Sequence, residues 1–223
     1  MSELTRYGYR DAISGFFEFP TENARRILPA HLEPAELHHG SSIFSMTCFD
    51  FTESMVGAYG ELVLAVIVSP LVKPGERLPK SAFYPFVVAT TTRAAREHAI
   101  ERWHLPHWME DVQMSFDRGE DRLTARVEAQ GEPVAELSIG QHSWQPVNHL
   151  YQCFMKDDNA YLAKITMEGS QSEHEEETGQ VRLFDHPLHG PLRIADVFDV
   201  PFREIWMRDG MQTFEPLQVL ETA

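Results

Sequence analysis

The chain has 223 residues, and 34 acidic residues against 19 basic ones give it a formal net charge of −15 at pH 7. This length is enough to bury a sizeable core, and a hydrophobic content of 43% argues against disorder. The acidic balance argues against binding to nucleic acid or to anionic membranes. The sequence has no apolar run of about 20 residues and no secretory signal. We therefore expect a cytoplasmic protein without a membrane partner.

Two cysteines and the absence of internal divisions bound the architecture further. Cys48 and Cys153 lie in or beside apolar segments and form no CxxC motif, so we expect two buried free thiols. No repeat of 20–50 residues and no linker rich in Ser, Gly or Pro divides the chain. The sequence predicts one domain over residues 1–223.

The first half of the chain reads as strands with two helices. Thr21 is a candidate cap for a short helix that runs to Leu28 and stops near Pro29. Apolar and β-branched segments without a helical period predict three strands, and the second of them is apolar enough to be buried on both faces. These strands are 43–49, 61–68 and 83–89.

A second helix is predicted from about Thr92 to Trp103. Ala95, Ala99 and Trp103 recur every four residues and form one buried stripe. Pro106 prevents the helix from continuing, because it lacks the amide hydrogen and disfavours helical backbone at the preceding residue.

The second half again predicts strands. Val112, Met114 and Phe116 alternate with polar residues, as expected for a half-buried strand. A hairpin is predicted from 123–129 and 133–142, and the acidic stretch 170–179 is expected to form a solvated hairpin tip between 161–167 and 181–184. The predicted class is α+β, mostly β, with a curved or closed sheet.

Several segments in this order resemble the acetoacetate decarboxylases. The segment Gly57-Ala-Tyr-Gly-Glu61 resembles the family's G-x-Y-x-E motif. The other matching segments are Arg25–Pro34, Ala94–Trp108, Leu183–Pro187 and Pro201–Ile205. The resemblance implies a cone-shaped β-barrel with a few short helices around an apolar pocket, usually in a homo-oligomer. It implies a small carbonyl or carboxylate compound as ligand.

The sequence departs from this family where the catalytic lysine is expected. In the family, Pro-Lys-Lys follows the helix, and the first lysine forms an imine with the ketone of a β-keto acid. Here Pro106 is followed by His107 and Trp108. Imidazole cannot form such an imine, so the family's mechanism is not available at this position. A gain of function on His107→Lys would support this register.

Only four lysines could replace the missing amine: Lys73, Lys80, Lys156 and Lys164. Lys73 lies in a turn sequence, and Asp157 and Asp158 beside Lys156 would raise its pKa rather than lower it. Lys80 and Lys164 lie in strand patterns, and they are the two candidates for a relocated imine lysine.

The candidate pocket residues follow mainly from the resemblance. Glu61 matches the family's pocket glutamate and opens an apolar strand, where a charge is costly unless it is paired or at the rim. A raised pKa would suit it for proton transfer. The alternative is a residue at the strand start that faces water. Tyr59 belongs to the same motif. Arg10 aligns with an arginine near the substrate carboxylate, or is a surface residue.

The segment after the second helix supplies the remaining candidates. His107 is a candidate general acid or base, or else a hydrogen-bonded residue filling the lysine's volume. Trp108 and His104 are candidate substrate contacts. A metal site of His104, His107 and Glu61 is a further alternative, although Pro106 disrupts the spacing of the two histidines. We expect no resident metal, and no nucleotide cofactor because no phosphate-binding motif is present.

Three hypotheses of function follow. The first is a decarboxylase-like protein that performs lysine-independent acid–base chemistry with Glu61, His107 and Arg10. The second is a true β-keto acid decarboxylase that uses Lys80 or Lys164. The third is a non-catalytic ligand-binding or assembly module.

Overall fold

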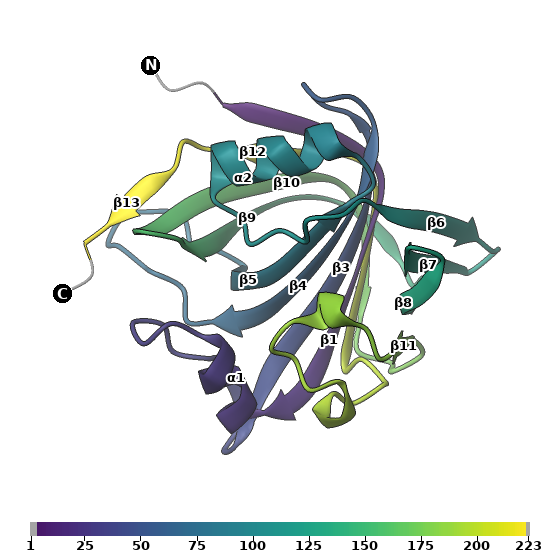
Figure 1. Ribbon diagram of the computed structural model, residues 1–223, viewed down its shortest axis with the longest axis horizontal. Helices are drawn as coiled ribbons and strands as arrows, with labels where there is room; N and C mark the ends of the chain where they lie inside the picture. Colours follow the sequence, from purple (N-terminus) through teal and green to yellow (C-terminus); the bar gives the residue numbers. More distant parts are fainter. Residues whose placement is uncertain (1–3, 222–223) are drawn as a thin grey trace.

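Two β-sheets and two short α-helices make up the structure, a computed structural model that describes residues 4–221 (Figure 1). The helices are α1 (Thr21–Ile27) and α2 (Arg93–Trp103). The strands of the larger sheet are β1 (Thr5–Pro20), β2 (Glu36–His38), β3 (Ser41–Glu53), β4 (Tyr59–Val68), β5 (Ser81–Thr90), β9 (Trp144–Lys156), β10 (Ala160–His174), β12 (Arg203–Phe214) and β13 (Gln218–Leu220). Those of the smaller sheet are β6 (Val112–Arg118), β7 (Arg122–Ala129), β8 (Glu132–Gly140) and β11 (Gln180–Leu183). Two 3₁₀ turns are Pro187–His189 and Ile194–Asp196.

The larger sheet closes into a barrel. Its strand order is β1-β12-β10-β9-β5-β4-β3-β2, and β1 also pairs with β3, so seven strands form a ring. All neighbours in the ring are antiparallel except β5 and β9. The predicted class, mostly β with a closed sheet and few helices, is confirmed.

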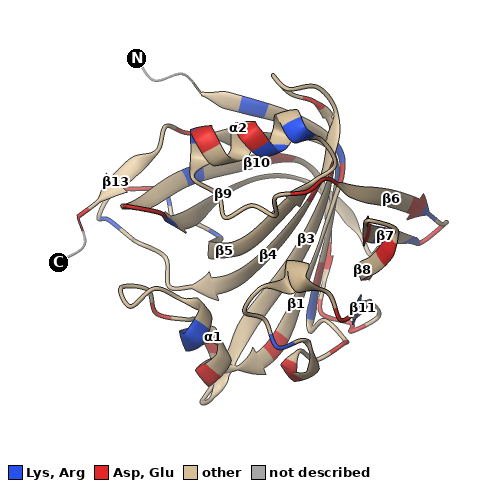
Figure 2. Ribbon diagram, in the orientation of Figure 1, with Lys and Arg blue, Asp and Glu red and all other residues tan. Residues whose placement is uncertain are grey.

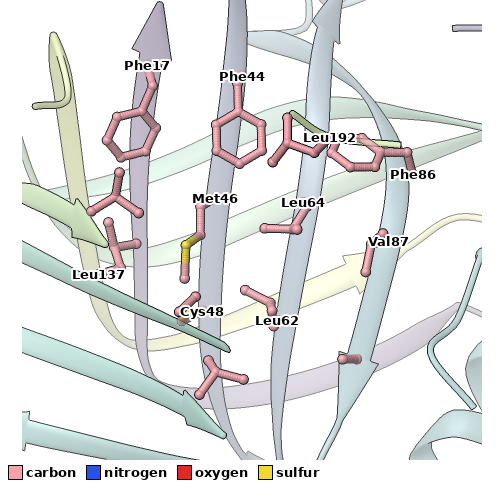
Figure 3. Packing of buried hydrophobic residues seen from close by; sticks show 14 of the residues in the cluster. Phe17, Phe44, Met46, Cys48, Leu62, Leu64, Phe86, Val87, Leu137 and Leu192 are labelled. Atoms are coloured by element: carbon pink, nitrogen blue, oxygen red, sulfur yellow. The ribbon is translucent and has the colours of Figure 1, made fainter. Parts of the chain in front are cut away.

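Strand β4 shows how the barrel wall separates two apolar cores. Leu62 and Leu64 point outward and belong to the outer core shown in Figure 3. Glu61 and Val63 point inward. Since successive side chains of a strand lie on opposite faces, a strand buried on both faces carries nearly continuous apolar sequence. This confirms the prediction for 61–68.

The smaller sheet covers the outer face of the barrel. Leu123, Leu137 and Ile139 are fully buried and belong to the same cluster as the outward-facing residues of β3 and β4. The predicted hairpin is β7 and β8, and it turns at Gln130 and Gly131, both with positive φ. The predicted alternation of β6 is also observed.

The two helices match the predicted positions, with one correction. Thr92 caps α2 by accepting a hydrogen bond from the Ala95 amide, and the predicted alanine–tryptophan stripe is buried. The Thr21 cap is wrong, because the hydroxyl of Thr21 instead pairs with Ser42 Oγ at 2.8 Å and Pro20 holds the cap position.

The predicted hairpin at 170–179 is wrong in its pairing and for residues 170–174, although residues 175–178 are an exposed loop as expected. Strand β10 continues to His174 between β9 and β12, and β11 pairs with β8 of the other sheet. Gln171, Ser172 and His174 are buried. The acidic letters hide a strand because its polar side chains find partners inside the protein rather than in water.

Charged residues are sparse on the strands that line the barrel centre and more frequent on α2 and the loops (Figure 2). Both cysteines are free and buried, as predicted. Within residues 4–221, neither helix is long and apolar enough to cross a membrane.

Candidate active site

A cavity of about 100 Å³ lies inside the barrel. Most of its lining is apolar, from residues such as Phe16, Phe83 and Met207. The lining side chains that carry polar atoms are Ser14, Ser45, Thr47, Glu61, Tyr151, Cys153 and Gln212. Among the described residues, no lysine, arginine or histidine lines this cavity. Pockets of this kind bind small molecules through apolar contact and a few polar groups.

Glu61 is held in the barrel wall by its neighbour in sequence. The Gly60 amide donates to Thr91 Oγ1 at 2.9 Å, and the Thr91 amide donates to the Gly60 carbonyl at 3.0 Å. A Cβ at Gly60 would lie 3.1 Å from Met114 Sδ and 3.1 Å from Thr91 Cγ2. Glycine at this position lets the start of β4 pack closely, and the next side chain then faces the cavity.

The Glu61 carboxyl has no compensating partner. Among residues 4–221, no hydrogen bond or ion pair to this carboxyl is found, and burial raises its pKa to about 8. Because the charged form loses hydration without gaining a partner, the neutral acid is favoured. Glu61 is therefore mostly protonated at pH 7 and can act as a proton donor, or as a base once it has lost its proton.

Two hydroxyl groups supply hydrogen-bond donors in the same cavity. Ser14 on β1 and Thr47 on β3 are register partners, and their hydroxyl oxygens are 2.9 Å apart. One hydroxyl donates to the other, so the second keeps its hydrogen for a ligand. Such a pair can bind a carbonyl oxygen.

Tyr59 lies in a smaller chamber next to the cavity, and Glu61 lines both spaces. Tyr59 and Glu61 of the G-x-Y-x-E segment thus both face the interior. Their chemical roles stay predictions.

Arg10 does not lie in the cavity. It is exposed on the outside of the barrel, and its guanidinium pairs with Asp50. Its neighbour Tyr9 is buried in the barrel interior, and alternation along β1 turns the next side chain outward. The structure therefore corrects the expected placement of Arg10 beside a substrate carboxylate.

His107 and Trp108 also lie outside the cavity lining. The Val88 amide donates to the Pro106 carbonyl and the Trp108 amide donates to the Val88 carbonyl, both at 2.8 Å. This fixes the segment against β5 and leaves Leu105, not His107, among the residues that line the cavity. Trp108 packs on the outer core, with its ring 5.7 Å from that of His186.

The environment of His107 keeps its ring neutral. Burial lowers the pKa of His107 to about 4. Its Nδ1 donates to the Trp108 carbonyl at 2.5 Å, and its buried Nε2 has no partner among the described residues. His107 does not line the cavity, where the resemblance implies that the reacting residue lies. Its role as an acid or base stays a prediction.

His104 ends helix α2 with φ of 53° and lies away from the cavity. Its ring stacks on Tyr161 with centroids 4.3 Å apart, and its Nδ1 is 3.3 Å from Asp157 Oδ2. Within residues 4–221, no group of three or more His, Cys, Asp or Glu side chains is arranged to hold a metal ion.

The two candidate replacement lysines are engaged elsewhere. Lys80 pairs with Glu173 and lies 3.3 Å from His149 Nε2. Lys164 pairs with Glu76 at 2.7 Å. Neither lines the cavity or the chamber.

Sequence comparison now identifies the family. The profile described as "Acetoacetate decarboxylase (ADC)" matches residues 2–191. The chain belongs to the acetoacetate decarboxylase family. A sequence search of curated proteins found no match.

Solved structures related to this family share the fold. Acetoacetate decarboxylase from Legionella pneumophila is 17% identical with a TM-score of 0.69, covering 99% of this chain and 88% of that one. An acetoacetate decarboxylase-like enzyme from Sphingomonas wittichii RW1 is 12% identical with a TM-score of 0.66, covering 100% and 95%. The enduracididine biosynthesis enzyme MppR, solved with pyruvate, is 12% identical with a TM-score of 0.63, covering 99% and 92%. At these identities the likeness shows the fold alone.

Proposed function

We propose that this family member binds a small carbonyl compound in the barrel cavity and transforms it by acid–base chemistry at Glu61, without a lysine imine. The observation that carries the proposal is the unpaired Glu61 carboxyl in a cavity whose described lining contains no amine. An imine requires a primary amine at the substrate, whereas a buried carboxyl with a pKa near neutrality suits proton transfer.

The charge of the lining favours an uncharged ligand. A carboxylate buried in this cavity would find no cation among the described lining residues, and above pH 8 it would meet the negative charge of Glu61. A neutral ketone or aldehyde needs only a hydrogen-bond donor, which the Ser14 and Thr47 pair supplies. We therefore place neutral carbonyl compounds ahead of keto acids.

Enolisation is the simplest reaction that these groups support. The ionised fraction of Glu61 removes a proton from the carbon next to the carbonyl, so the C–H bond breaks and a carboxyl O–H forms. The enolate oxygen accepts a hydrogen bond from the Ser14 and Thr47 pair. The proton on Glu61 exchanges with solvent, and Glu61 then returns a proton to the carbon. The product therefore carries a hydrogen from solvent.

Hydrogen exchange tests this proposal directly. The protein is incubated with acetone or pyruvate in D₂O, and the loss of ¹H signal is followed by NMR. We expect exchange of acetone to exceed that of pyruvate and to fall at least about 100-fold in Glu61→Gln. Glu132→Gln, an exposed change in the smaller sheet, is the matched control. A wild-type rate equal to that of Glu61→Gln contradicts the proposal.

The competing hypotheses make different predictions in the same assays. A relocated lysine, Lys80 or Lys164, would be trapped as a covalent adduct by borohydride with acetoacetate, and such an adduct would overturn lysine independence. A non-catalytic module would be stabilised thermally by a ligand without any exchange. Single-domain folding, a homo-oligomer and a cytoplasmic location remain predictions. Analytical sedimentation measures the oligomeric state.

A further inference from the structure

A small chamber lies between helix α2 and the barrel, beside the main cavity. Ala99 and Trp103 of α2 line it, and the Trp103 ring packs on Phe214 of β12 with centroids 4.5 Å apart. The chamber measures about 20 Å³, which is room for about one water molecule. The polar side chains in its lining belong to Tyr7, Tyr59, Glu61, His98, Trp103 and Gln212.

A hydrogen-bond chain leads from this chamber to the protein surface. Trp103 Nε1 donates to Tyr7 Oη at 2.7 Å, and Tyr7 Oη lies 2.7 Å from His98 Nε2. Since an indole N–H only donates, the hydroxyl hydrogen of Tyr7 remains for the neutral His98 ring. Tyr7 also keeps one lone pair that can accept from a water molecule. The His98 ring is partly exposed, so the chain ends at solvent.

Glu61 is the polar group that joins the two spaces. The carboxyl lines the cavity and the chamber alike. The remaining cavity lining is mostly apolar. An acid or base in such a site must regain or lose its proton between turnovers, and the chamber is the neighbouring space with hydrogen-bonding groups.

We propose that the chamber holds a water molecule linking the Glu61 carboxyl to the Tyr7 hydroxyl, so that Tyr7 and His98 carry protons between Glu61 and solvent. The proposal deepens, and for its catalytic purpose rests on, the function proposed above. In the outward direction Glu61 gives its proton to the water, the water gives one to Tyr7, and Tyr7 gives its own to His98 Nε2. The resulting imidazolium then releases a proton from Nδ1 to solvent. Each step breaks one bond to hydrogen and forms another, and the return path is the reverse.

The surroundings of His98 suit this role. Burial and the positive charge of Arg102 lower the pKa of His98, while Glu101 acts in the opposite direction. A mostly neutral ring can accept a proton from Tyr7. Trp103 is a positioning residue, because its N–H occupies one lone pair of Tyr7 and fixes the direction of the hydroxyl.

The direct test measures proton exchange at Glu61 rather than turnover. After a rapid pH jump across pH 8, time-resolved infrared spectroscopy follows the carboxyl band that Glu61→Gln removes. We expect Tyr7→Phe and His98→Gln to slow protonation at least tenfold while leaving the titration midpoint within about half a unit. Tyr84→Phe, which removes the hydroxyl of a tyrosine that lines neither the cavity nor the chamber, should leave the rate unchanged.

Chemical rescue separates a proton carrier from a structural residue. Added imidazole should restore at least half of the lost rate in His98→Gly, which a loss of packing would not allow. Wild-type rates in both Tyr7→Phe and His98→Gln would overturn the relay even if Glu61-dependent exchange of acetone is observed. A slowed relay together with no exchange of acetone in any variant would instead support the relay and remove the proposed function.

Discussion

A carboxyl group in the outer core and a carboxyl group in the barrel cavity differ in their hydrogen bonding. Between the barrel and the smaller sheet, Glu204 is fully buried and accepts hydrogen bonds from the amides of Gly140, Thr178 and Gly179 at 2.7–3.0 Å. Inside the barrel, Glu61 has no such donor among the described residues. The first carboxyl is used to join two sheets, and the second retains its capacity to exchange a proton.

The same contrast extends to Asp11. It is buried in the barrel wall, accepts from Trp206 Nε1 at 2.9 Å and pairs with Arg118 of the smaller sheet. Buried charges with all their partners fix how two sheets pack together. An unpaired buried acid destabilises the fold, and such groups are found mainly at functional sites. Of these three carboxyl groups, Glu61 is the one without a hydrogen-bond donor among the described residues.

The largest effect on stability is expected at Glu204, where the barrel meets the smaller sheet. Glu204→Ala leaves three backbone amides without an acceptor and creates a void, so the free energy of unfolding should fall by about 4 kcal/mol. Urea unfolding followed by circular dichroism measures this change, with the exposed Glu132→Ala as its control. A loss below about 1 kcal/mol would show that the contact between the barrel and the smaller sheet does not depend on this carboxylate.

The opposite sign is expected at Glu61. Its folded pKa of about 8 exceeds the ordinary value of 4.5, so the folded state binds the proton more tightly. Stability is undiminished below about pH 4.5, falls as pH rises to about 8, and is constant above it. At pH 7 the penalty is on the order of 3 kcal/mol.

Glu61→Gln removes that penalty. The variant should be more stable than wild type at pH 7 by up to about 3 kcal/mol, and the difference should vanish towards pH 4.5. Urea unfolding of both proteins at a series of pH values gives the difference. A variant that is less stable than wild type at every pH would indicate a partner for Glu61.

A lysine placed in the cavity tests which residue after α2 faces it. Leu105→Lys puts an amine in the lining shared by Glu61, where burial should lower the pKa of that amine. We expect borohydride to trap acetoacetate on most Leu105→Lys molecules, and to leave His107→Lys near the wild-type background. Mass spectrometry reads both, and the reverse pattern would restore His107 to the reacting position.

The smallest effect concerns the two cysteines. Cys153 lines the cavity and Cys48 lies in the outer core, and burial raises the pKa of both thiols. Methyl methanethiosulfonate should therefore modify Cys153 slowly but at least about tenfold faster than Cys48, because only Cys153 borders open space. Peptide mapping distinguishes them, and equal rates would argue for global unfolding as the route.

The sequence predicted the strands whose two faces are both apolar and the helix whose stripe is regular. It missed β1 and β12 because glycines and charged residues interrupt their patterns, and it missed β9 because a proline and neutral polar residues interrupt its pattern. Gly210 is one example: a Cβ there would lie 2.2 Å from Tyr9 Oη, a close approach across strands that no local pattern reveals.

The candidate site was predicted only in part, for a related reason. Glu61 and Tyr59 lie on a regular strand, where alternation fixes the direction of each side chain. The orientation of Leu105 and His107 depends on pairing with Val88, a contact with another segment. Tyr7 and His98 carried no motif, and only the closed barrel brings them beside Glu61.

The protonation state of Glu61 tests the account most directly. Difference infrared spectroscopy between wild type and Glu61→Gln isolates its carboxyl band, which is titrated from pH 4 to pH 10. We predict a protonated carboxyl at pH 7 and a midpoint near 8. A midpoint near 4.5 would mean that the carboxyl is solvated or paired, and it would contradict both the poised acid and the chemistry proposed for it.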